Sequence, residues 1–300
     1  MLREKIVKSV LNKHKKRDSW FLDDYSVNPY EGCSCNCLYC YIRGSKYGEQ
    51  MDDSLAVKSN VLEILEKQLQ VKARKKEYGF VAVGSATDAY IHHESNYKLT
   101  EGILNLLLKY RFPVFISTKS RLIVRDIKLL KEINRNAILP EDLAGKLSHG
   151  VILSVSISTM DTRITNMLEP GAATPQERLD TLRELSAEGF LTGVNAIPVL
   201  PFISDTEEEL SKIISAAASH GAEYVLTGGL TLFGDGVADS KTLYYKFLSR
   251  YAPSLIPKYE DLYRTNTYPP YNYQQQLSSL SSALCSRYGI RNRIIKQERI

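Results

Sequence analysis

Four of the five cysteines in this chain fall within eight residues, at Cys33, Cys35, Cys37 and Cys40. Four ordinary core residues would not crowd together in this way. A disulfide framework is disfavoured because the chain has 300 residues, lacks the pattern of a secretory signal and keeps Cys285 far from the others. The segment therefore predicts a metal site.

The spacing of these cysteines bears on the kind of metal. In Cys33-x-x-x-Cys37-x-x-Cys40, three thiolates in one tight loop can bind three irons of a [4Fe-4S] cluster and leave the fourth iron open to a ligand that is not protein. A structural zinc ion usually takes four ligands as two short, well-separated pairs. Ligation of one tetrahedral ion by all four cysteines would also be sterically awkward. We expect an iron-sulfur cluster on Cys33, Cys37 and Cys40, with zinc as the alternative and Cys35 as a bystander.

The elements that must position this loop are predicted by hydrophobic periodicity. An extended run at 20–28 precedes the cysteines, and five apolar runs rich in β-branched residues predict buried strands. Buried strands that alternate with helices pair in parallel through right-handed crossovers, so the fold class is α/β, either a barrel or a doubly wound sheet. The five strands are expected at 80–85, 113–118, 151–158, 191–200 and 222–229. The helices are expected at 2–14, 54–72, 98–110, 125–134, 175–188 and 206–219.

Polar residues recur at the C-terminal ends of these predicted strands. That face is where parallel barrels place their active sites. The cysteine loop follows the extended run at 20–28. The ends of the later predicted strands supply Ser85, Thr87, Asp88, Lys119, Ser156, Ser158 and Asn195.

Several ordered motifs resemble a known family. The segments SVNPYEGCSCNCLYCY, VGSATDAYIHHE, FISTKS, RLIVRD, SISTMD, LEPGAATPQERL and LTGVNAIPVLPFISDTEEEL together resemble the branch of the radical S-adenosylmethionine superfamily that contains spore photoproduct lyase. The similarity runs from about Tyr25 to Leu232. It implies a partial (β/α)6 barrel of TIM type with parallel strands, and a [4Fe-4S] cluster and S-adenosylmethionine at its C-terminal mouth.

The resemblance also implies roles for the strand-end residues. Lys119 would pair with the carboxylate of S-adenosylmethionine, the alternative being a salt bridge to Asp88 or Glu169. Ser85 and Thr87 would recognise its amino group, or else make ordinary strand-end hydrogen bonds. Three further contacts are implied: Ser156 and Asn195 on the ribose, 195–198 along the adenine, and Tyr39 against the cluster loop.

Two positions depart from the family pattern. Spore photoproduct lyase carries a cysteine, its hydrogen-atom donor, just before its Thr-Asp pair, whereas this chain has Ala86 before Thr87 and Asp88. Relatives often have glycine after the proline that follows the fifth strand, where this chain has Phe202. The first departure argues against repair of the spore photoproduct by the same route.

Four other side chains carry weaker indications. His92 and His93 are adjacent, so they point apart, and we expect them at the surface or facing substrate rather than binding one metal. Glu169 contacts substrate or S-adenosylmethionine, or else stops a helix. Cys285 lies on a helical pattern and is expected to be a small buried hydrophobe.

Composition and charge bear on partners. With 43% hydrophobic and 24% charged residues the chain matches globular proteins. No apolar run approaches the ~18 residues that cross a bilayer, so we expect a cytoplasmic protein without a membrane partner. Residues 1–17 carry seven basic side chains against Glu4, and residues 286–300 carry five against Glu298. Basic ends favour an anionic partner, nucleic acid being the commonest, although two solvated amphipathic helices would look the same.

We therefore expect three parts: a basic N-terminal helix in 1–20, the barrel in 21–235, and a helical and irregular C-terminal extension in 236–300 packed on the barrel. The resemblance implies an enzyme of lyase or transferase type that cleaves S-adenosylmethionine to a 5′-deoxyadenosyl radical, with flavodoxin or ferredoxin as electron donor. The basic ends and the stretch YPPYNYQQQ favour nucleic acid as substrate. The alternatives are a peptide, a small molecule, or a non-catalytic iron-sulfur protein that binds nucleic acid.

Overall fold

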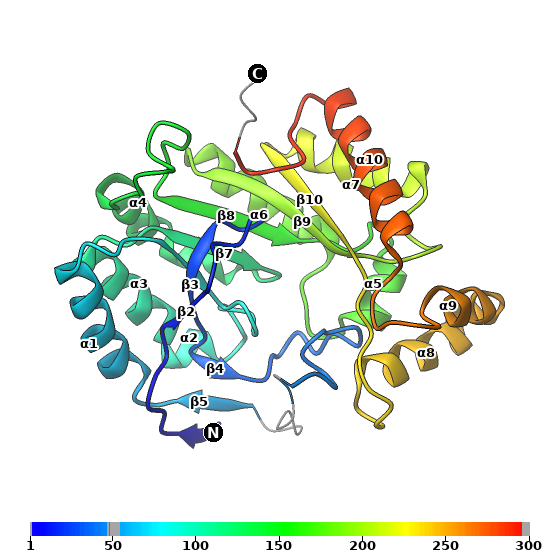
Figure 1. The fold of residues 1–300 in the computed structure, drawn as a ribbon, viewed down its shortest axis with the longest axis horizontal. Coiled ribbons are helices and arrows are strands. Elements are labelled where there is room, and N and C mark those ends of the chain that lie inside the picture. The colour runs from blue at the N-terminus through cyan, green and yellow to red at the C-terminus, as the bar shows by residue number, and fades with distance from the viewer. Residues whose placement is uncertain (1, 47, 49–54, 296–300) are drawn as a thin grey trace.

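A sheet of seven strands forms the centre of the computed structural model, which describes residues 2–46, 48 and 55–295 (Figure 1). Neighbouring strands pair in parallel, except that β2 pairs with β3 in the antiparallel sense. In spatial order the strands are β10 (Tyr224–Gly229), β9 (Leu191–Val199), β8 (Val151–Ser156), β7 (Val114–Thr118), β6 (Phe80–Val83), β3 (Asp23–Val27) and β2 (Asn12–Lys13).

The strand order decides between the two architectures that periodicity left open. From β3 to β10 the parallel strands lie side by side in the order in which the chain makes them. A doubly wound sheet would reverse its order at a switch point. The edges are β2 and β10, so the barrel is open. The predicted α/β fold, a partial barrel with parallel strands, is confirmed.

Helices pack against the sheet along its length. Leu65 and Leu69 of α1 pack with Ile103 of α3 and with the outward side chains of β6 and β7. Farther along the sheet, α6 and α7 bury leucine and isoleucine against β8, β9 and β10. The helices between β5 and β10 are α1 (Val61–Arg74), α2 (Glu94–Tyr97), α3 (Leu99–Tyr110), α4 (Ile127–Asn136) after a 3-10 turn at Arg121–Asp126, α5 (Thr162–Leu168), α6 (Pro175–Ala187) and α7 (Glu207–Ser219).

Local sequence sets the ends of these helices. Thr174 and Glu177 form a capping box at the start of α6, with Pro175 in the first turn. Thr206 caps α7, whose first turn carries three glutamates that favour the positive end of the helix dipole. Gly221 follows α7 at φ +84°, a conformation that favours glycine.

The predicted helix at 2–14 is wrong. The structure has two short strands there, β1 (Arg3–Lys5) and β2, within a segment that binds to the rest of the fold. β1 pairs with β5 (Ala56–Lys58), which in turn pairs with β4 (Tyr30–Glu31). The backbone N–H groups of Val10 and Leu11 donate to the Gln68 side chain on α1. The hydrogen-bond partner of these N–H groups is distant in the sequence, so a local helical pattern could not predict it.

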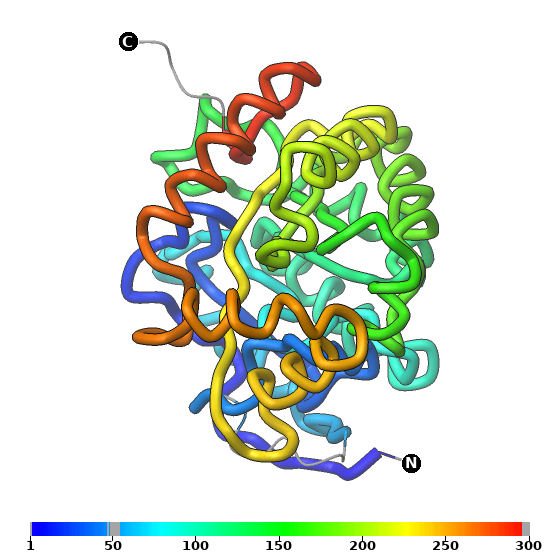
Figure 2. The backbone as a smooth tube through the Cα atoms, turned by 90° about the vertical axis from the view of Figure 1, so that its right-hand side faces the viewer, coloured from blue at the N-terminus to red at the C-terminus, as the bar shows by residue number. Residues whose placement is uncertain are grey.

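The C-terminal segment packs on the sheet and on the cysteine loop. It contains α8 (Ser240–Tyr251), a 3-10 turn at Pro253–Leu255, α9 (Ile256–Leu262) and α10 (Tyr271–Arg287). Figure 2 shows α10 along the outside of the molecule, where Leu284 and Cys285 are buried against the α7 layer. Tyr244 and Phe247 of α8 share a hydrophobic cluster with Cys37. Cys285 is thus a buried hydrophobe, as expected, while the three domain boundaries stay a prediction.

Within the described residues, no helix is both long enough and apolar enough to span a membrane.

Candidate active site

A cavity of about 800 Å³ lies at the C-terminal ends of the parallel strands. Glu169 does not line it, whereas nine other residues that the sequence analysis placed at the cluster or the cofactor do. These residues come from the loop after β4, the turn after β6, and the ends of β7, β8 and β9. They are Cys33, Cys37, Tyr39, Cys40, Ser85, Thr87, Lys119, Ser156 and Asn195.

The cysteine loop is held by the connection between α5 and α6. The N–H of Leu38 donates to the Leu168 carbonyl at 2.8 Å, and the N–H of Gly171 donates to the Cys35 carbonyl at 3.1 Å. A Cβ atom at Gly171 would lie 1.9 Å from the Ser34 carbonyl oxygen, so the close approach of the two segments requires glycine. This contact fixes the loop without using a thiol.

The thiols themselves are free, and all four face the cavity. A hydrogen bond with Cys35 lowers the pKa of Cys33, whereas burial raises the pKa of Cys37 and of Cys40. Among residues 2–46, 48 and 55–295, no three His, Cys, Asp or Glu side chains gather as ligands of one metal ion. Thiolates that bind three different irons of a cluster have no need to meet at one point.

A buried ion pair stands behind the cysteine loop. Arg178 of α6 pairs with Glu169, and their side chains are 1% and 2% exposed. The Tyr39 hydroxyl donates to Glu169 and lies 3.0 Å from the Ser158 hydroxyl. Arg178 also donates to the Ser156 carbonyl at 2.8 Å. The network therefore ties Tyr39 to the end of β8.

Sequence reasoning missed Arg178, although a sign of it was present. Pro175, Arg178, Leu182 and Leu185 are spaced as one face of a helix, and all four are buried. An arginine on an otherwise apolar face needs a buried anion, and Glu169 is the carboxylate that meets it.

The turn after β6 is shaped by glycine and by Asn28. Gly84 has φ +83°, and a Cβ atom there would lie 2.6 Å from the Ala89 nitrogen. The Asn28 amide donates to the Ser85 hydroxyl at 3.2 Å, and its carbonyl accepts the N–H of Ala86 at 2.8 Å. Ser85 and Ala86 are thereby held at the cavity.

Asp88 joins three parts of the site. One of its carboxylate oxygens accepts the Thr118 hydroxyl at 2.7 Å. The other accepts the backbone N–H of Lys119 at 2.7 Å and the Cys35 thiol at 3.8 Å. The carboxylate thus connects the turn after β6, the end of β7 and the cysteine loop, a role that the sequence analysis did not assign.

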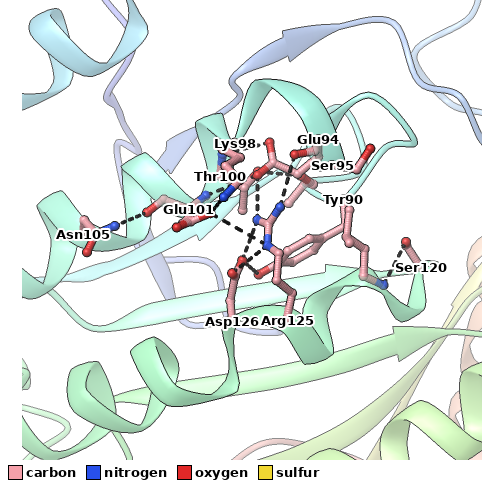
Figure 3. A network of polar contacts seen from close by, with 12 residues as sticks. Tyr90, Glu94, Ser95, Lys98, Thr100, Glu101, Asn105, Ser120, Arg125 and Asp126 are labelled. Carbon is pink, nitrogen blue, oxygen red and sulfur yellow. Dashed lines mark hydrogen bonds and ion pairs between the residues drawn. The ribbon is translucent and has the colours of Figure 1, made fainter.

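A second polar network supports the connection that carries Asp88 (Figure 3). Arg125 pairs with the fully buried Glu94 and with Asp126, each at 2.8 Å. Asp126 accepts the Tyr90 hydroxyl at 3.0 Å, and Glu94 accepts the N–H of Thr100 at 3.0 Å. These contacts fix the chain between β6 and α3 from behind.

The two histidines on this connection do not line the cavity. His92 is exposed, and His93 is the residue that precedes α2. They do not gather with a third ligand for a metal ion in the described part of the chain.

Lys119 points its ammonium group along the cavity wall. Its Nζ donates to the Ser156 hydroxyl at 3.0 Å, and both side chains line the cavity. Burial lowers the pKa of Lys119, but the charges of Cys37 and Glu169 outweigh it and the net pKa is raised. Neither salt bridge suggested for Lys119 forms among the described residues. Asp88 accepts the backbone N–H of Lys119, and Glu169 pairs with Arg178.

Among the strand-end residues proposed to contact the cofactor, two have a buried polar atom that lacks a partner. The Thr87 hydroxyl and the Asn195 carbonyl oxygen make no hydrogen bond, although the Asn195 amide donates to the Ser117 hydroxyl at 2.9 Å. Buried polar groups in folded proteins are nearly always hydrogen-bonded. A polar ligand in the cavity would satisfy both, and three thiols beside a cationic lysine suit a cluster with an anionic co-ligand.

Comparison with known proteins agrees with this donor set. Residues 27–215 match the family model of the Radical SAM superfamily. This chain belongs to that superfamily. Radical S-adenosylmethionine enzymes use a [4Fe-4S] cluster and S-adenosylmethionine, and they need an external reductant.

Several proteins resemble this superfamily member over most of its length. An uncharacterized protein of Mycobacterium bovis is 31% identical, covering 89% of this chain and 75% of the relative. A radical SAM Nα-GlyT isomerase of Pseudomonas phage M6 is 24% identical, covering 82% of this chain and 47% of the relative. The solved structure of spore photoproduct lyase complexed with dinucleoside spore photoproduct matches with a TM-score of 0.65 at 14% identity, covering 96% and 79% of the two chains. At this identity the structural likeness concerns the fold.

Proposed function

We propose that this radical S-adenosylmethionine enzyme holds its [4Fe-4S] cluster on Cys33, Cys37 and Cys40 and acts on nucleic acid. The observation that carries the proposal is the convergence of the three thiols, Lys119 and the unpaired Thr87 hydroxyl on one cavity. A non-catalytic iron-sulfur protein would leave the lysine and the unpaired polar atoms without a purpose.

Each side chain then has a task in binding. When bound, the cluster and S-adenosylmethionine supply a 5′-deoxyadenosyl radical, which takes a hydrogen atom from the substrate. Lys119 pairs with the carboxylate of S-adenosylmethionine and is oriented by Ser156 at 3.0 Å. Thr87 and Ser85 accept hydrogen bonds from the amino group of S-adenosylmethionine. Asn195 binds the ribose through its unpaired oxygen.

Tyr39 and the wall around it exclude water. Tyr39 is 5% exposed and is anchored through Glu169, while Ile197 and Pro198 give the same cavity an apolar surface suited to a purine ring. Exclusion of water protects a reactive intermediate from side reactions.

Support for a nucleic-acid substrate comes from exposed aromatic and basic side chains, some of them at the cavity. Tyr41 lines the cavity and is 46% exposed, and Tyr271 at the start of α10 is 75% exposed. Exposed Lys15 and Lys16 follow His14, which also lines the cavity. Exposed aromatic rings stack on bases, and lysines contact phosphates. One similar solved structure, that of a lyase complexed with a dinucleoside, points the same way.

The test is anaerobic reconstitution followed by reduction with dithionite in the presence of S-adenosylmethionine. We expect about four irons per chain and release of 5′-deoxyadenosine and methionine. Cys33→Ser, Cys37→Ser and Cys40→Ser should each lose the cluster. Cys35→Ser is the matched control and should keep it, because the spacing in the sequence favours the other three cysteines as ligands.

The substrate class is tested with deuterated material. Deuterium should pass into 5′-deoxyadenosine from deuterated nucleic acid and not from peptide extracts. Transfer from peptides instead would favour the alternative substrate class, and zinc at one equivalent without iron would refute the proposal as a whole.

A further inference from the structure

One wall of the cavity is not used by the proposed cofactor contacts. It is formed by Asn12, His14, Asp18, Asp23 and Ser26, which come from β2, β3 and the turn between them. The proposed cluster and S-adenosylmethionine contacts all come from the cysteine loop and from β6 to β9. We refer to these five residues as the edge wall, since β2 is an edge strand.

Asp23 is the central residue of the edge wall. It is 3% exposed, and its Oδ1 is buried without a hydrogen-bond partner. Its Oδ2 lies 3.3 Å from Nδ1 of His14. Burial raises the pKa of Asp23 to about 6, although His14 opposes this. An unsatisfied buried carboxylate oxygen destabilises the fold, so packing does not account for the residue.

The other carboxylate of the wall has a local role. Oδ1 of Asp18 accepts the backbone N–H groups of Trp20 and Phe21 at 2.7 and 2.8 Å, and so shapes the turn that leads into β3. The same turn brings Phe21 to the cavity, where its ring centroid lies 5.1 Å from that of Phe115. An apolar aromatic surface therefore lines the same cavity as Asp23.

We propose that the edge wall is the substrate subsite and that it binds a nucleobase through an N–H donor facing Asp23. This inference rests on the proposed nucleic-acid substrate. A planar ring fits against Phe21 and Phe115, and its N–H group satisfies Oδ1 of Asp23. Two carboxylates disfavour an anion here, so the phosphates of the substrate stay outside, on the side of Lys15 and Lys16.

Trp20 offers a direct measurement of this binding. It is the one tryptophan of the chain, is 45% exposed, and its ring centroid lies 6.4 Å from that of Phe21. We therefore propose to titrate the reconstituted protein with nucleosides and to follow Trp20 fluorescence. The probes are two matched pairs, uridine with 3-methyluridine and adenosine with N6,N6-dimethyladenosine. In each pair methylation removes the N–H donor and keeps the ring.

The expected result is that at least one parent nucleoside quenches Trp20 and binds about ten- to a hundredfold more tightly than its methylated partner, the usual effect of a hydrogen bond to a charged group. Asp23→Ala should abolish this discrimination. Asp180→Ala, on the surface of α6 and away from the cavity, should leave it unchanged. The comparison of each parent nucleoside with its methylated partner uses the unaltered protein, so it does not depend on whether a variant folds.

The outcomes separate the two proposals. If parent and methylated nucleosides bind equally, or if Asp23→Ala still discriminates, the subsite is refuted while a nucleic-acid substrate stands. If neither the nucleosides nor a short oligonucleotide binds, both the subsite and the nucleic-acid substrate are refuted.

Discussion

Replacement of Lys119 by methionine separates a cofactor contact from a structural one. Methionine keeps the apolar length of the side chain and removes the ammonium group. In the described residues that group makes one hydrogen bond, to Ser156 at 3.0 Å, and no ion pair. Its loss should therefore change the free energy of unfolding of the unliganded protein by only about 1 kcal/mol.

The effect on S-adenosylmethionine should be larger. Truncation of one partner of a desolvated charge pair costs about 2 to 4 kcal/mol of binding free energy. This corresponds to a dissociation constant that is roughly 30- to 1000-fold larger. Isothermal titration of reconstituted protein measures this constant, while iron content and thermal unfolding check the cluster and the fold. Lys128→Met, exposed on α4, is the matched control. Unchanged affinity with an intact cluster would show that Lys119 does not meet the carboxylate.

Three further predictions concern other parts of the molecule. Because β1 and β2 are paired strands, the basic segment is tested by substitution rather than deletion. Changing exposed Lys8, Lys15 and Lys16 to Gln should lower the slope of the logarithm of the nucleic-acid binding constant against the logarithm of the salt concentration by up to about three. An unaltered slope would show that these lysines do not touch phosphates. Ala86 lines the cavity but cannot return a hydrogen atom, so chromatography should detect 5′-deoxyadenosine but no catalytic conversion of spore photoproduct to thymines; clean repair would refute this. The pKa of Asp23 rises on folding from 3.8 to about 6, so its contribution to stability is present at low pH and is lost as pH rises through this range. Urea unfolding of Asp23→Asn and of the native chain should therefore be compared at about pH 4 and at about pH 7. The free energy of unfolding of the variant minus that of the native chain should rise between these pH values by about 3 kcal/mol at most, and an equal difference at both would contradict the raised pKa.

The strand ends of the site were predictable because they depend on short-range pattern. A buried strand is a short apolar run, and the polar residue at its end stands out against that run, as Lys119 does after β7 and Asn195 within β9. Parallel pairing then brings all such ends to one edge of the sheet. The spacing of Cys33, Cys37 and Cys40 is likewise a local property of one loop.

The residues behind the site were not predictable in the same way. Arg178 and Glu169 are nine positions apart in the sequence, but their link to Tyr39 spans 130 positions. Asp88 gains its importance from contacts with Cys35 and Lys119, which lie in different elements. Partner choice of this kind depends on how elements pack, and a single sequence records it only as an isolated polar residue.

The sequence by itself determined the α/β class, the parallel strands and the family, because periodicity and short motifs are encoded over a few residues. Tertiary structure alone decided that the basic N-terminal segment forms edge strands and that Asp23 lies in the same cavity as the cysteines. The physical reason is that a backbone N–H or a buried carboxylate takes its partner from whatever element lies beside it in space. For residues 2–14 that neighbour is β3, β5 or α1, each separated from it in the chain.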